Sequence, residues 1–79
     1  MNYKIEEIKN KLENILKGIT EREQEYYENQ NWYMRQKQTT KRKYKKPIYE
    51  AEENRCLTAR HELTMIKFDL KKILEEIRN

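Results

Sequence analysis

The stretch CLTARHELTMIKFDLKKILEEI, residues 56–77, decides the fold, because its apolar residues recur at alternating intervals of three and four positions. This spacing is that of the a and d positions of heptads, which form the apolar seam of a coiled coil. The seam positions are Cys56, Ala59, Leu63, Ile66, Leu70, Ile73 and Ile77. The sequence therefore predicts one long amphipathic helix in this half of the chain.

The first half of the chain carries the same pattern. Its seam positions are Ile5, Ile8, Leu12, Ile15 and Ile19. The segment TTKRKYKK, residues 39–46, has no heptad character, and Pro47 after it suits the first turn of a helix. We predict a single domain over 1–79, with a helix over 2–38, a basic loop over 39–46 and a helix over 47–78.

A loop this short makes the two helices antiparallel neighbours. The predicted fold class is all-α, an antiparallel two-helix coiled-coil hairpin that could dimerise into a four-helix bundle. Pairing a with d across the hairpin sets Ile8 beside Ile77 and Ile15 beside Leu70. A register one heptad lower also pairs a with d, but it would place Pro47 inside a helix, which Pro resists.

Gly18 leaves an alternative open. Glycine can end a helix, and Thr20 followed by Glu23 forms a capping box that can start one, so the chain could contain three helices. The heptad pattern passes from Ile15 to Ile19 without a change of phase, which favours a continuous helix.

Composition limits the functions that the chain can have. Of its 79 residues 41% are charged, with one Gly, one Pro and one Cys, which is typical of long helices with a small core. A lone cysteine, Cys56, suits a reducing compartment. We find no apolar run for a signal peptide or membrane span, and expect a cytoplasmic protein. Abundant Lys, Asn, Ile, Tyr and Glu, with AT-rich codons, hint at a low-GC bacterium or its phage.

Residues suited to catalysis or metal binding are scarce. His61-Glu62 begins a string like the HExxH zinc motif, but Met65 stands where the second histidine belongs. Cys56 and His61 point roughly 140° apart on a helix, so they cannot act as nucleophile and base. We expect no enzyme activity, no metal, no cofactor and no small-molecule substrate.

Positive charge is concentrated between the predicted helices. Residues 35–46 carry +7 and no acid, whereas the whole chain carries +4, so the remainder is −3. Clustered cations neutralise phosphates and tyrosine rings stack on bases, which favours nucleic acid or an acidic, nucleic-acid-handling protein as partner. A solvated loop that only aids solubility is the alternative, and the absence of a basic helix with a broad apolar face argues against a membrane. The candidate site residues are Arg35, Lys37, Lys41, Arg42, Lys43, Tyr44, Lys45 and Lys46.

A second apolar stripe runs along the predicted second helix, apart from the seam. It comprises Leu57, His61, Met65 and Phe68, with Thr64 beside them. An exposed row of this kind is typical of a packing surface, used for homodimerisation or for docking on another protein. We therefore expect a non-enzymatic binding or regulatory protein that engages nucleic acid through its basic loop. The alternative is a small phage-type inhibitor or adaptor that acts by protein contact through this stripe.

Overall fold

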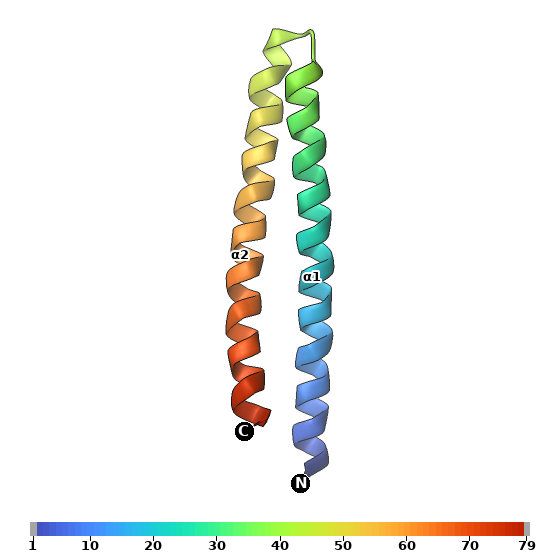
Figure 1. Cartoon of the computed structure of the whole chain (residues 1–79), viewed down its shortest axis with the longest axis vertical. Helices are drawn as coiled ribbons and strands as arrows, with labels where there is room; N and C mark the ends of the chain where they lie inside the picture. The colour runs from blue at the N-terminus through green and yellow to red at the C-terminus, as the bar shows by residue number, and fades with distance from the viewer. Residues whose placement is uncertain (1, 79) are drawn as a thin grey trace.

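The computed structural model describes residues 2–78, and the side chains of residues 3–77. It forms an antiparallel helical hairpin, a rod with extents of 62 × 14 × 12 Å, as the sequence predicted (Figure 1). Helix α1 covers Asn2–Thr39, the short 3-10 helix η1 covers Lys43–Lys45, and helix α2 covers Lys46–Arg78. The two ends of the chain lie together at the base of the rod, and the turn forms the opposite tip (Figure 1).

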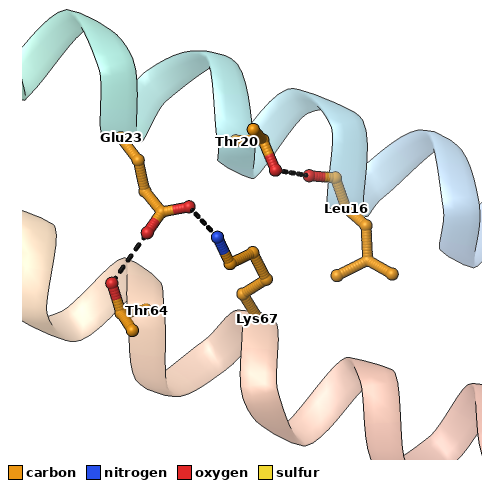
Figure 2. A network of polar contacts seen from close by, with 5 residues as sticks. All are labelled: Leu16, Thr20, Glu23, Thr64 and Lys67. Carbon is orange, nitrogen blue, oxygen red and sulfur yellow. Dashed lines mark hydrogen bonds and ion pairs between the residues drawn. The ribbon is translucent and has the colours of Figure 1, made fainter.

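Helix α1 is continuous through Gly18, so the three-helix alternative is wrong. The capping box does not form, because its two residues bond elsewhere (Figure 2). The Thr20 hydroxyl donates to the Leu16 carbonyl oxygen at 3.0 Å, within the same helix. Glu23 instead reaches across to α2. Helix α1 therefore keeps its direction over its whole length.

Local hydrogen bonds form the turn. The Thr40 amide donates to the Gln36 carbonyl at 2.9 Å and so closes the last turn of α1. The Arg42 amide then donates to the Thr40 hydroxyl at 3.2 Å. Pro47 is the second residue of α2, where its missing N–H would have no partner within the helix. This turn is what places the basic segment at the tip.

The buried face of each helix differs from the predicted seam. Leu74 is 5% exposed, whereas its neighbour Ile73, a predicted d position, is 44% exposed. In α1 likewise, Leu16 is half-buried while Ile15 is 51% exposed. Leu16 and Leu74 are e positions of the same heptads. Both helices thus pack through a and e, a rotation of roughly 50° from the predicted a and d at 100° per residue.

A ladder of e-position pairs across the hairpin accounts for this rotation. Its rungs recur every seven residues along each helix. They are Leu16 with Leu74, Glu23 with Lys67 at 2.5 Å, Gln30 with Arg60 at 2.6 Å, and Lys37 with Glu53 at 2.9 Å. The d positions of upper α1 are Arg22, Asn29 and Gln36. The predicted seam sets them beside Leu63, Cys56 and Tyr49, which offer them no complementary charge. Rotation of the two helices toward their e positions therefore forms complementary contacts that the predicted seam lacks.

The rotation leaves a thin core. Among the side chains that the structure describes, those of Ile19, Cys56 and Leu74 are buried and none is fully enclosed. Five isoleucines predicted to lie in the seam are instead about half exposed. These are Ile5, Ile8, Ile15, Ile66 and Ile73. Assigning these five to the core was wrong. Ile8, Ile15, Ile66 and Ile73 are d positions on the flank that the rotation opens, and Ile5 is an a position near the base of the rod.

Candidate functional site

The predicted basic site lies at the tip of the rod, where the chain reverses (Figure 1). Lys41, Arg42 and Lys43 are exposed at the turn itself. Lys46 is exposed at the start of α2, and Lys45 is half-buried. Across the described residues, no carboxylate lies within ion-pair distance of the five cations of 41–46. The charge of this segment therefore faces solvent unneutralised.

Lys37, also predicted for this site, has a different environment. Its Nζ lies 2.9 Å from Glu53 Oε2, in the uppermost rung of the ladder. The hydrogen bond to that carboxylate raises the pKa of Lys37. Arg35 is exposed on α1, one turn below the tip. The structure thus brings most of the predicted cations together, while Lys37 also ties the two helices to each other.

Tyr44 is the aromatic residue that the tip presents to solvent. Its side chain is 66% exposed. The Arg42 guanidinium lies 3.5 Å from its hydroxyl, at the outer limit of a hydrogen bond. One ring and one guanidinium therefore stand side by side at the turn, with the ring faces open.

The other aromatics near the tip pack mainly on one another. Trp32 meets Tyr33 edge-on with centroids 5.1 Å apart, and it meets Tyr49 at 6.2 Å. Tyr33 and Tyr49 face each other across the two helices at 6.4 Å. Edge-to-face pairs at such distances are favourable. This cluster stabilises the upper hairpin, although about half of Trp32 remains in water.

The second predicted surface lies on the outer side of α2. Its residues Leu57, His61, Met65 and Phe68 are all exposed. The ammonium of Lys72 lies 4.8 Å from the centre of the Phe68 ring, a cation–π contact that partly shields this ring. The predicted stripe is therefore exposed, and all of its residues come from a single helix.

A third surface was not foreseen from the sequence. We call it the isoleucine face: Ile8 and Ile15 from α1, with Ile66 and Ile73 from α2, on the open flank of the hairpin. These side chains are between 44% and 51% exposed. The complementary charges at Glu23 and Lys67, and at Lys37 and Glu53, were the signal that could have revealed it. They show which flank the helices close, and hence which flank they leave open.

Cys56 and His61 occupy different environments. Cys56 lies in the buried seam, and burial raises the pKa of its thiol. His61 is exposed on the outer side of α2. Within residues 3–77, no three His, Cys, Asp or Glu side chains come together as a metal site would require. The two residues are therefore not part of one reactive centre.

Comparison with known proteins gives no relative. The chain matches no protein-family model, and no curated sequence and no solved structure is similar to it. Neither described helix has an apolar window long enough to cross a membrane.

Proposed function

We propose that the chain is a non-enzymatic nucleic-acid-binding protein that grips phosphate backbones with its basic tip. The observation that carries this is the cluster of five cations in residues 41–46 at the end of a rod. Four of them are exposed, and none has an ion-pair partner among the described residues. Lys and Arg that neutralise phosphates release condensed counterions, which supplies most of non-specific affinity. The single buried thiol suits a reducing compartment, so we place this activity in the cytoplasm.

The width of the tip favours binding to the backbone over reading of sequence. Each helix with its side chains is about 10 Å across, so the hairpin with its side chains is about 20 Å wide, more than the 14 Å that its backbone spans. The major groove of B-DNA is about 12 Å wide and admits one helix. The tip would therefore rest on phosphates with its turn and leave base edges unread. This predicts affinity that varies little with sequence.

Side-chain charge, rather than helix dipoles, would supply the attraction. The negative end of the α1 dipole and the positive end of the α2 dipole meet at the tip, and their fields largely cancel. Tyr44 adds a further contact with single strands, whose bases can stack on its open ring. Such stacking is worth about 1–3 kcal/mol per base.

The test is a salt titration of binding to a duplex and to a single strand of mixed sequence. Its variant replaces Lys41, Arg42 and Lys43 with Gln. Each lost duplex contact lowers the steepness of log K against log salt by about 0.9. The matched control replaces Lys17, Lys71 and Lys72, toward the base of the rod, with Gln and so removes the same charge. All three are exposed and far from the tip. We expect weak, shallow binding from the tip variant and unchanged binding from the control.

Two outcomes would contradict the proposal. Wild-type protein that binds neither strand form at low salt would exclude it, leaving an acidic protein surface as the tip's partner. Equal losses in the two triple variants would show that net charge, and not the tip, drives association.

Tyr44→Ala should weaken single-strand binding more than duplex binding, because only unpaired bases reach the ring.

The outer stripe of α2 supports a second candidate, an adaptor or inhibitor that acts by protein contact. Met65 is 69% and Phe68 60% exposed, which is unusual for large apolar side chains. Under this hypothesis, replacing both with Gln abolishes capture of the partner protein from host extract, while the triple tip variant still captures it. The opposite result would assign the partner to the tip.

A further inference from the structure

We infer that the isoleucine face is a self-association surface, on which a second copy of this chain packs with both basic tips at the same end. This inference is independent of what the tip binds. It starts from the half-exposed Ile8, Ile15, Ile66 and Ile73, which are d positions of both helices on the flank opposite the ladder. Soluble monomers rarely leave such a patch uncovered.

The flank also has hollows that a facing helix could fill. At the base, Ile5, Ile8 and Ile77 line a depression of about 150 Å³. Further up, a depression of about 260 Å³ is lined mainly by apolar residues, with one arginine: Ile15, Gly18, Ile19, Arg22 and Leu63. A side chain added at Gly18 would meet no atom of this chain within 4 Å. The surface is therefore both apolar and indented, as knobs-into-holes packing requires.

Charges along the edges of this face indicate that its partner is a second copy of the chain. At 100° per residue, each g position lies beside the d position that carries an isoleucine. Near the base of the rod, the charged g positions are Lys4 and Lys11 on α1, and Asp69 and Glu76 on α2. All four are exposed. One edge of the face is thus basic and the other acidic, which is the pattern that a second copy of the same surface complements.

The same charges select one of two symmetric arrangements. With a two-fold axis along the rod, α1 of one copy faces α2 of the other, so the basic edge meets the acidic edge. With the axis across the rod, α1 faces α1 and like charges meet on both edges. Opposite charges across an interface fix register, and like charges are penalised. The axis along the rod is therefore favoured, and it places the two tips together.

The positions of these charges along the rod agree with that arrangement. Ile8 and Ile77 line the same hollow, so they are level along the rod. Lys11 then falls between the levels of Asp69 and Glu76. In the isolated chain Lys11 is 3.4 Å from Glu7, but both side chains are well exposed, and such pairs are weak. Nothing therefore prevents Lys11 from turning to the second copy.

Higher on the rod the complementarity is mixed. Glu25 of one copy would lie near Glu62 of the other, which is unfavourable. Arg22 lies one turn from Glu25, but Arg55 lies two turns from Glu62 and is paired with Glu52, so the two arginines offset the repulsion only in part. The apolar base and its charged edges therefore supply the preference, and the middle of the rod opposes it weakly.

Sedimentation equilibrium of the full chain over a wide concentration range tests the surface. We expect a monomer–dimer equilibrium for wild type. Replacing Ile15 and Ile66 with Gln should weaken the dimer by a hundredfold or more, with helicity checked by circular dichroism. The control replaces Met65 and Phe68 with Gln and should leave the dimer intact. A wild type that stays monomeric throughout, or a dimer lost only in the control, would overturn the inference.

Charge reversal tests the arrangement without touching the apolar core. Lys4→Glu with Lys11→Glu should weaken the dimer roughly tenfold, since several exposed pairs together contribute about 1.4 kcal/mol. Adding Asp69→Lys and Glu76→Lys should restore it. With the axis across the rod, neither change would matter, because both edges would stay like-charged. Failure of the second pair to restore a dimer weakened by the first would also contradict the inference.

Spin labels on Tyr44→Cys measure the tips directly. Wild type treated with the same label is the control for reaction at the buried Cys56. Tips at the same end should lie within about 30 Å of each other, given interaxial distances of 8–10 Å between packed helices. Tips at opposite ends would be separated by at least about the length of the rod, 62 Å. The short distance supports the inference, and the long one refutes it.

Discussion

Two adjacent residues near the base, Ile73 and Leu74, give the sharpest test of how the helices pack. Leu74 is 5% exposed, and truncating a buried leucine costs 2–5 kcal/mol. Because the seam of a two-helix rod is open on both sides and can relax, we expect Leu74→Ala to cost about 2–3 kcal/mol. A seam built from a and d positions would require the opposite order, with Ile73 the more costly of the two.

The expected cost for Ile73 follows from its 44% exposure. Full burial of an isoleucine contributes about 1.5–3 kcal/mol, so a side chain that is half in water contributes about 1 kcal/mol. Alanine is a better helix former than isoleucine by a few tenths of a kcal/mol, which offsets part of the loss. We therefore expect Ile73→Ala to cost about 0.5–1 kcal/mol in the monomer.

Urea unfolding followed by far-UV circular dichroism measures both costs, at low micromolar concentration where a weak dimer dissociates. Leu74→Val is the milder companion if Leu74→Ala does not fold. Equal costs, or a larger cost at Ile73, would refute the a and e packing. Repeating the measurement at high concentration separates packing from association, because only the cost at Ile73 should rise if a second copy covers it.

Two further predictions concern single side chains in the seam. Hydrogen bonds from Lys67 and Thr64 lower the pKa of Glu23 below its ordinary 4.5. Its ionised form therefore stabilises the hairpin above that pH, and this contribution is lost as pH falls through the lowered native pKa. Glu23→Gln should flatten the acid side of a stability-against-pH curve, and the exposed control Glu21→Gln should not. Cys56 is buried, and the pKa of its thiol is raised. Alkylation of Cys56 in the native chain should therefore be at least roughly tenfold slower than in urea. Equal rates would show that the thiol is not in the seam.

The hairpin itself could be read from the sequence. Two long heptad runs, separated by a short basic segment and followed by Pro47, leave little choice of architecture. The clustering of charge at the tip follows from the same segmentation, because the turn necessarily lies where the heptads stop. Exposure of Tyr44 was equally accessible, since no seam position falls on it.

The rotation of the helices could not be read in the same way. Apolar residues occupy both d and e in the lower hairpin, as Ile15 beside Leu16 and Ile73 beside Leu74. Hydrophobic spacing alone therefore fits two faces about equally well. Pairs such as Glu23 with Lys67 select which of the two faces is buried. The stabilisation that Glu23 provides depends on a partner 44 residues away in the sequence. Periodicity within one helix carries no information about such a pair.

The tip and the isoleucine face, if both act as proposed, are coupled through electrostatics. Two copies with their tips together bring two clusters of five cations within a few helix diameters. Like charges at that distance repel, and salt weakens this repulsion by screening. This repulsion opposes the dimer when no anion is present. A bound phosphate backbone neutralises both tips at once, so it favours the dimer and is bound more tightly by it than by either monomer. Linkage makes the two effects equal in free energy: whatever nucleic acid adds to dimer stability, dimerisation adds to nucleic-acid affinity. The exposed isoleucines would then set the threshold concentration at which the protein binds, and the tip would determine what it binds.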